Sequence, residues 1–223
     1  MINQRKPKRN NFLLMTKSAI CIELHYLGSL EFFTRLINSK KVILEVSDYF
    51  MKQTYRNRFY ILGPNQIQML TIPVHYQKKT IFRDVTIDYH QNWIKNQRRA
   101  VQAAYGKAPF YDYFFDLFDQ VWISRPTYLL DLSISMMTVC LKILQIDMSF
   151  NFTYIFQQEV QKDIIDLRNI ISAKKPSESR NLYQPISYKQ NFGSNFAANL
   201  SIIDLLMCEG PNALNILQQS IND

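Results

Sequence analysis

The chain has few of the residues that build common functional motifs. Its 223 residues include 5 Gly and 8 Pro, which excludes collagen-like and low-complexity classes. None of the glycines forms a GxGxxG, GxxxxGK[ST] or GxSxG pattern. The sequence therefore gives no support to a dinucleotide site, a P-loop or a nucleophile elbow.

Cysteine and histidine are also scarce. Cys21, Cys140 and Cys208 lie in apolar surroundings and form no CxxC pair. An odd number of cysteines without metal-binding spacing is typical of buried thiols in a reducing compartment. The three histidines are widely spaced and form no HExxH motif. We therefore expect neither a metal nor a cofactor.

Long hydrophobic runs are absent too. No apolar stretch approaches the ~18 residues that a membrane-spanning helix needs. Residues 12–15 are too few for the hydrophobic core of a signal peptide. Together with the cysteine pattern, these absences predict a cytoplasmic protein. No feature of the sequence sets an oligomeric state.

Positive charge is present in excess and is unevenly distributed, with a formal net charge of +8. Residues 1–10 contain four basic residues and no acid, and we predict a disordered basic tail over 1–17 before a single domain over 18–223. Residues 193–223 contain no Lys or Arg. A basic first half favours an anionic ligand there, although solvated charges explain the same pattern.

The first 90 residues consist of short apolar stretches separated by turns, which predicts a strand-rich half. Ser29 is placed to cap a helix over 30–37. The expected strands cover residues 19–24, 42–45, 59–62, 67–75 and 80–89, the last two forming a hairpin.

Helical periodicity replaces this pattern after residue 92. Trp93, Gln97, Val101 and Tyr105 recur every four residues and share one helical face. The expected helices cover 93–105, 110–121, 127–144, 163–171, 201–208 and 212–221, with a late strand at 150–156. The predicted fold is mixed α/β, with a strand-rich N-terminal half followed by a helical half that ends in a pair of helices.

The segment 44–58, LEVSDYFMKQTYRNR, is a charged loop between two predicted strands. Its Asn57 and Arg58 suit a carboxylate or phosphate, because Arg offers a fixed fork of donors and Asn a donor-acceptor amide. Lys52 suits phosphate as a point charge. The alternative is that an arginine of this loop pairs with Glu45 or Asp48 and holds the loop together.

Two residues are candidate acids or bases. Glu45 closes a predicted buried strand with an Arg expected nearby, which makes it a candidate general base. A structural ion pair is the alternative. His25 follows the first strand and is a candidate acid or base near neutral pH, with a purely structural histidine as the alternative.

Three further polar residues lie in apolar contexts. Gln97 has to find hydrogen-bond partners in a core network or in a pocket. Tyr105 could stack on a sugar, although aromatic residues at helical spacing usually belong to the core. Asp204 is the only charge in its apolar run, and Ser201-x-x-Asp204 matches a capping box, which would explain the carboxylate without a ligand.

Four sequence elements together resemble the WbqC-like protein family, over about residues 19–221. They are K-x-x-Y-x-N-R at 52–58, LTIPV at 70–74, W…AYGKAPF at 93–110, and a C-terminal signature of Tyr188, Gln190, F-x-x-NLSIIDLL at 196–206 and Gly-Pro at 210–211. Two departures stand out. Family members open with Gln-Pro-x-Tyr-x-Pro where this chain has His25-Tyr26-Leu27-Gly28, and many have His where this chain has Gln97.

The resemblance implies a transferase that moves an aminoacyl group, often glycyl, or an acyl group onto a sugar in bacterial O-antigen or other surface-polysaccharide biosynthesis. A nucleotide-sugar or another anionic small molecule would be its substrate, and Glu45 or His25 would handle the proton. The expected substrate-binding residues are Lys52, Asn57, Arg58, Tyr26, Gln97, Tyr105, Gln190 and Asp204.

Two other functions compete with this one. The first is a non-catalytic ligand-binding or assembly protein of the same pathway. The second is nucleic-acid binding through the basic helix face of Lys95, Arg98 and Arg99. The sequence contains no RRM, KH or helix-turn-helix motif, so nucleic-acid binding has the weakest support.

Overall fold

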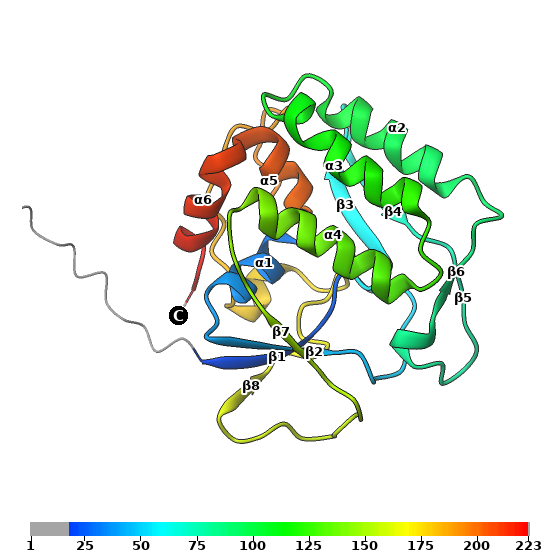
Figure 1. Ribbon diagram of the computed structural model, residues 1–223. Helices are drawn as coiled ribbons and strands as arrows, with labels where there is room; N and C mark the ends of the chain where they lie inside the picture. Colours follow the sequence, from blue (N-terminus) through cyan, green and yellow to red (C-terminus); the bar gives the residue numbers. More distant parts are fainter. Residues whose placement is uncertain (1–17, 223) are drawn as a thin grey trace, which may run out of the picture.

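A four-stranded parallel sheet forms the base of the molecule in the computed structural model, which describes residues 18–222 (Figure 1). The strands follow the order β7-β2-β1-β8. Their bounds are Phe150–Phe152 for β7, Lys41–Glu45 for β2, Ala19–Glu23 for β1 and Ile164–Asp166 for β8. The predicted disordered tail, residues 1–17, lies outside the described residues.

The two faces of this sheet differ. Ile20, Ile22 and Leu44 point into the main core, where α1 (Leu30–Ile37) packs with its predicted Ser29 cap. Cys21 and Ile43 alternate with them and lie outside that core, on the opposite face. In Figure 1 the helices stand above the sheet, and the loop from β7 to β8 hangs below it.

A second strand region is antiparallel. In it, β3 pairs with β4 and β5 pairs with β6 across a short 3-10 helix, η1. The bounds are Arg58–Leu62 for β3, Ile67–Thr71 for β4, Val74–His75 for β5, Phe82–Asp84 for η1 and Thr86–Ile87 for β6.

The predicted hairpin of 67–75 with 80–89 is therefore wrong in most of its length. Only β5 and β6 pair as expected, while β4 pairs with β3. Pro73 cannot donate a hydrogen bond to a ladder, and it separates β4 from β5. Phe82 is fully buried, which fixes η1 in place of an extended second arm.

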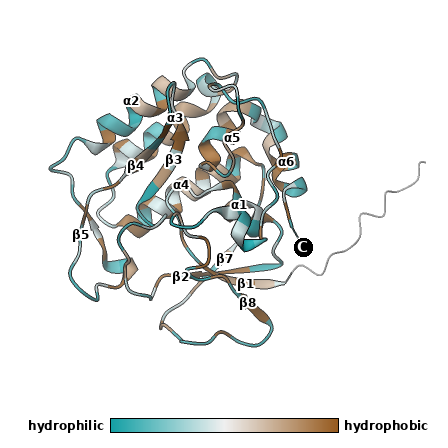
Figure 2. Ribbon diagram, turned by 180° about the vertical axis from the view of Figure 1, so that it is seen from behind, coloured by the Kyte–Doolittle hydropathy of each residue, from teal (hydrophilic) through white to brown (hydrophobic). Residues whose placement is uncertain are grey.

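Most predicted helices are confirmed to within a few residues. Their bounds are Trp93–Tyr105 for α2, Tyr111–Ser124 for α3, Leu129–Ile143 for α4, Ile202–Glu209 for α5 and Ala213–Gln219 for α6, with a 3-10 turn at Gly210–Asn212. Helix α2 shows both hydrophilic and hydrophobic stretches in Figure 2, as an amphipathic helix does. Trp93, Gln97, Val101 and Tyr105 form its buried face, as predicted.

After residue 150 one prediction is wrong and another is confirmed only in part. The expected helix at 163–171 is the strand β8, which pairs in parallel with β1. The sequence IID is compatible with a strand. The backbone N–H of Leu167 donates to the Cys21 carbonyl, so pairing with the open edge of β1 makes this segment a strand and not a helix. The expected strand at 150–156 ends at Phe152. A short 3-10 helix, Ser177–Arg180, follows within a polar segment.

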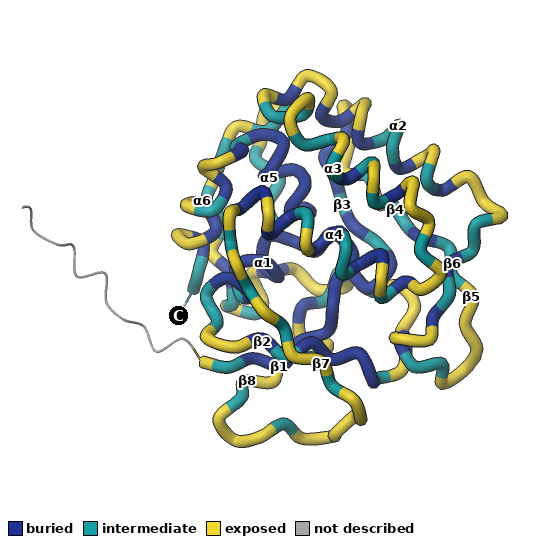
Figure 3. The backbone as a smooth tube through the Cα atoms, viewed as in Figure 1, coloured by how far each residue is buried: buried dark blue, intermediate teal, exposed yellow. Residues whose placement is uncertain are grey.

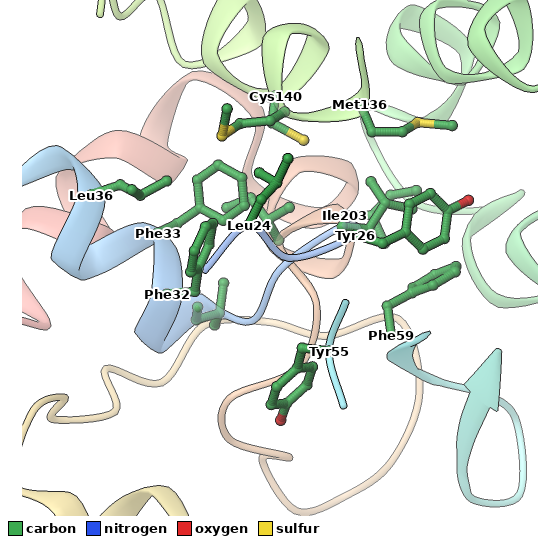
Figure 4. Packing of buried hydrophobic residues seen from close by; sticks show 14 of the residues in the cluster. Leu24, Tyr26, Phe32, Phe33, Leu36, Tyr55, Phe59, Met136, Cys140 and Ile203 are labelled. Atoms are coloured by element: carbon green, nitrogen blue, oxygen red, sulfur yellow. The ribbon is translucent and has the colours of Figure 1, made fainter. Parts of the chain in front are cut away.

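The buried apolar side chains form one cluster that joins elements distant in sequence. Figure 4 shows Leu24 and Phe33 from the N-terminal region packed near Cys140 of α4, with Ile203 of α5 close by. Tyr55 lies at the border of this cluster, and its hydroxyl points away from it (Figure 4). Among the helices of residues 18–222, none is both long and apolar enough to span a bilayer. The mixed α/β prediction is confirmed.

Candidate functional site

The carboxyl ends of three parallel strands gather buried charges at one edge of the sheet. Glu23 ends β1 and Glu45 ends β2, and the two residues are paired in register. Both are buried, and Arg168 follows the end of β8 with its side chain also buried. Ligands of open α/β sheets bind outside the carboxyl ends of the strands, so this edge is the candidate site.

Glu45 is held by three donors. Its Oε1 accepts hydrogen bonds from the Ser47 backbone N–H at 2.8 Å and from Thr153 Oγ1 at 2.6 Å. Its Oε2 accepts one from an Nη of Arg168 at 3.2 Å. The structural ion pair that was the alternative for Glu45 therefore exists, but its partner is Arg168 and not Arg58.

Arg168 joins the sheet edge to the β7–β8 loop. Its guanidinium donates to Asp166 at 2.7 Å and to the carbonyls of Gln157 and Gln158 at 2.7 and 3.1 Å. The hydrogen bonds from Arg168 hold the pKa of the Asp166 carboxyl below its usual value. Because its donors are already engaged, Arg168 serves to fix the loop in place.

His25 lies beside Glu23 at the end of β1. Its Nε2 is 3.4 Å from Glu23 Oε1, and its ring stacks between Phe32 and Tyr55, with centroid distances of 4.4 and 5.1 Å. Although burial raises the pKa of Glu23, hydrogen bonds from His25 and the Asn169 backbone and nearby positive charge bring it below 4.5. Within residues 18–222, His25 Nδ1 is buried without a hydrogen-bond partner.

The charged loop is held together by Arg56, which sequence reasoning missed. Its guanidinium donates to the Tyr49 carbonyl at 2.6 Å and to Asp48 Oδ2 at 3.0 Å, and it lies over the Phe82 ring at 5.6 Å. Arg56 is 1% exposed. The alternative of an arginine that pairs with Asp48 and holds the loop together is therefore present, and that arginine is Arg56 and not Arg58.

The three predicted anion-binding residues lie in different surroundings. Lys52 is exposed, whereas Asn57 is buried and donates to the Ile72 carbonyl at 2.9 Å. An Nη of Arg58 lies 3.2 Å from the Met69 sulfur. In residues 18–222 no hydrogen bond joins these three side chains, and their role in binding stays a prediction.

A pocket of about 400 Å³ is lined by the open face of the sheet and by the β7–β8 loop. Of the candidates from the sequence, Glu45 alone lines it. Its charged lining residues are Lys41, Glu45 and Arg168, and its apolar ones include Cys21, Ile43, Phe152, Ile155, Val160 and Ile164.

A second buried polar cluster surrounds Asp204 in α5. The carboxylate accepts hydrogen bonds from Tyr105 at 2.8 Å, Tyr188 at 2.5 Å and Gln190 at 3.0 Å. Burial raises the pKa of Asp204, and these hydrogen bonds act in the opposite direction. Asp204 is fully buried. Three of the predicted substrate-binding residues, Asp204, Tyr105 and Gln190, thus contact one another.

The capping-box explanation of Asp204 is wrong. Ser201 does cap α5, since its Oγ accepts from the Ile203 backbone N–H at 3.4 Å. The Ser201 N–H, however, donates to the Tyr60 carbonyl at 2.9 Å, and the Asp204 carboxylate points to the tyrosines. Tertiary hydrogen bonds from Tyr105 and Tyr188 therefore replace the local bond to the Ser201 N–H that a capping box would form.

Tyr26 and Gln97 belong to a third hydrogen-bonded group. Trp122 Nε1 donates to the Tyr26 hydroxyl at 2.7 Å, and that hydroxyl donates to Gln97 Oε1 at 2.7 Å. Gln97 Nε2 donates to the Thr71 carbonyl at 3.2 Å. Burial raises the pKa of Tyr26. Gln97 is thus part of a core network, one of its two sequence-based alternatives.

Sequence reasoning missed Glu23, Arg56 and Arg168. Glu23 had a visible signal, because it ends the first apolar run as Glu45 ends the second. Arg168 lies in a segment predicted to be helical, so the sequence did not predict its position at the sheet edge. Only the parallel pairing of β1 with β2 and β8 brings these groups together.

Comparison with known proteins identifies the family. The model of the WbqC-like protein family matches residues 25–185 and 178–216. No curated protein and no solved structure gives a significant match. Because the two matched segments span most of the chain, and both the sheet edge and the Asp204 cluster fall within or beside them, the chain belongs to the WbqC-like protein family.

Proposed function

We propose that this protein transfers an acyl or aminoacyl group onto a sugar during bacterial surface-polysaccharide synthesis. The WbqC-like family is linked to O-antigen and surface-polysaccharide biosynthesis. The observation that best supports a catalytic role is the sheet edge, where Glu45 borders a pocket of about 400 Å³ and His25 and Glu23 end the neighbouring strand.

The chemistry is nucleophilic acyl transfer. An amine or hydroxyl of the sugar attacks the carbonyl carbon of an activated ester or thioester. A C–N or C–O bond forms, the bond from the carbonyl carbon to the leaving group breaks, and a base takes the proton of the nucleophile. The same proton then passes to the leaving alkoxide or thiolate, so the reaction needs no further reactant.

Two groups are placed to act as the base. Glu45 lines the pocket, and its Oε2 accepts one hydrogen bond from the chain, from Arg168, which leaves acceptor capacity for a sugar amine or hydroxyl. His25 has an unpartnered Nδ1, with Glu23 on its other nitrogen to orient the ring. Geometry favours Glu45, because His25 does not line the pocket.

Cys21 does not act as a nucleophile in this scheme. It lies in the pocket floor, and burial raises the pKa of its thiol to about 11, so the thiol is protonated at neutral pH. The acyl group therefore passes directly from donor to sugar, without an acyl-cysteine intermediate.

Product mass provides the test. The purified protein is incubated with nucleotide-sugars and with acyl or glycyl thioesters, and the sugar is examined for a gain in mass. We expect transfer in which Glu45→Gln lowers kcat by about 10²- to 10⁴-fold, the usual contribution of a general base. His25→Gln tests the second candidate base in the same assay. Glu159→Gln, an exposed residue of the same loop outside the pocket lining, is the matched control.

Lys52→Ala, Asn57→Ala and Arg58→Ala test the anion-binding prediction, and each is expected to raise KM for the nucleotide-sugar. Transfer that survives all of these changes and both base substitutions would place the reaction elsewhere. Saturable nucleotide-sugar binding without any mass gain would favour the non-catalytic alternative.

A further inference from the structure

The pocket beneath the β7–β8 loop also limits which group is transferred. We infer that it holds an uncharged aliphatic acyl group of medium length and discriminates against an aminoacyl group that carries an ammonium. This assignment rests on the proposed function for the identity of the reaction, but the binding preference follows from the pocket itself.

The first observation is the apolar character of the walls. Cys21 and Ile43 form the floor from two adjacent strands, and Ile164 continues it on β8. Val160 and Phe152 contribute from the loop and the edge strand. A floor of this kind gains free energy by covering aliphatic carbon, and the uncharged polar residues of the lining include Asn151, Thr153, Gln157 and Gln161.

The second observation is the charge of the lining. Lys41, Glu45 and Arg168 are its charged residues, which gives the lining a net charge of +1. The one carboxylate, Glu45, already binds Arg168, Thr153 and the backbone of Ser47. An ammonium placed here would lose hydration in a lining of net positive charge whose carboxylate already pairs with Arg168, and that desolvation is unfavourable.

The third observation is the size of the pocket. A volume of about 400 Å³ is within the range of small-molecule sites, and a two-carbon glycyl group would leave most of it to water. Lys41 and Glu45 end the same strand four residues apart, a span of roughly 13 Å at the usual rise of a strand. An extended chain of medium length can lie along that span.

The fourth observation is an exposed apolar rim. Tyr154 and Ile155 are 84% and 77% exposed, although both line the pocket. Figure 3 shows most of the loop exposed below the buried strands β1 and β2. Large exposed apolar side chains beside an apolar pocket are typical of a ligand-binding groove, because a bound chain covers them.

The matched ligands for the test are octanoyl-N-acetylcysteamine and its analogue of equal length with a terminal amino group, 7-aminoheptanoyl-N-acetylcysteamine. Calorimetry is used to measure the Kd of each with the full-length protein. We expect the octanoyl thioester to bind at least about tenfold more tightly, because the analogue buries an ammonium. Equal or tighter binding of the amino analogue, or no binding of the octanoyl thioester, would overturn the inference.

A charge placed in the wall makes the test specific to this pocket. Val160 is half-buried in the loop, so Val160→Asp is expected to fold and to shift the preference toward the amino analogue by about tenfold or more. Ile123→Asp is the control, since Ile123 is exposed on α3 and does not line the pocket. The same shift in both variants would place binding outside this pocket.

The outcome separates this inference from the proposed function. Octanoyl binding with the expected preference but without transfer to any sugar would contradict the transferase alone. Transfer of a glycyl group by a protein that does not bind the octanoyl thioester would contradict the acyl preference alone.

Discussion

The Asp204 cluster and the carboxyl edge of the sheet are both buried and polar, but they differ in how completely their atoms are paired. Asp204 receives hydrogen bonds from Tyr105, Tyr188 and Gln190. At the sheet edge, His25 Nδ1 and Arg56 Nε are buried and find no hydrogen-bond partner in the described part of the chain, and a pocket adjoins Glu45. Glu45 accepts three hydrogen bonds as Asp204 does, so the two regions differ in the pocket beside Glu45 and in the unpaired atoms near it, which leave contacts for a ligand.

This difference suggests two separate roles for the sequence elements that resemble the family, one in stability and one in binding. The C-terminal signature around Asp204 joins α2, α5 and the segment before α5 through a single carboxylate. The charged loop and the two strand-ending glutamates face the edge where ligands of parallel sheets bind. We therefore expect changes around Asp204 to affect stability first, and changes at the edge to affect binding and catalysis first.

The largest effect is expected for Asp204→Leu. The change removes the acceptor of three donors inside the fold, and each unsatisfied buried group costs about 1–3 kcal/mol. We expect a loss of about 3–5 kcal/mol in the free energy of unfolding, measured by urea denaturation. Asp116→Leu, at an exposed position of α3, is the control. A loss below about 1 kcal/mol would remove the basis for calling this cluster structural.

A smaller loss is expected for Gln97→Leu. The Tyr26 hydroxyl loses its acceptor and the Thr71 carbonyl loses a donor, while the leucine side chain still packs against apolar neighbours. The expected cost is about 1–2 kcal/mol in the same denaturation experiment. Gln102→Leu, exposed on the same helix, should change stability little. If both variants lose the same free energy of unfolding, the hydrogen bonds of Gln97 do not stabilise the fold.

The two regions should also respond to pH with opposite signs. The pKa of Asp204 is raised from 3.8 by burial, so its contribution to stability is present at low pH and decreases as the pH rises through the folded-state pKa. Burial also raises the pKa of Glu23, but the His25 hydrogen bond and nearby groups outweigh it and the net value lies below 4.5. Its contribution is therefore present above 4.5 and is lost as the pH falls through the folded-state pKa.

Subtracting the unfolding free energy of Asp204→Asn from that of the parent protein should give a difference that falls as the pH rises. The same subtraction with Glu23→Gln should give a difference that rises. Denaturation with urea across the acidic range measures both. Two curves with the same slope would mean that these carboxylates lie in equivalent environments.

The smallest effect is expected at the rim of the pocket. Ile155 is largely exposed, so Ile155→Ser removes little buried surface and should change the unfolding free energy by less than about 0.5 kcal/mol. It should nevertheless weaken binding of the octanoyl thioester, because it removes an apolar wall. A stability loss above about 1 kcal/mol would show that the loop residue supports the fold and not a ligand.

The local patterns of the sequence predicted much of the fold. The first strand, the capped helix 30–37 and the helices between residues 93 and 143 follow from periodicity and capping, because those signals lie within a few residues of one another. The strand β8 was missed, since Ile164–Asp166 becomes a strand only through the open edge of β1.

The candidate site was predictable only in part. The sequence indicated Glu45, His25 and the charged loop, but it did not single out Arg56 as the partner of Asp48. It also missed the partner of Glu45, since Arg168 lies 123 residues away along the chain. Charged side chains show no periodicity that identifies a distant partner, so such pairs come from tertiary structure alone.

The sequence by itself determined the mixed α/β class, most helices, the capping of α1 by Ser29 and the family. The tertiary structure decided which buried polar residues are saturated and which border a pocket. The physical reason is that helix and cap signals depend on neighbours in the chain, whereas the pairing of Asp204 with Tyr188 and of Glu45 with Arg168 depends on where strands and helices meet in space.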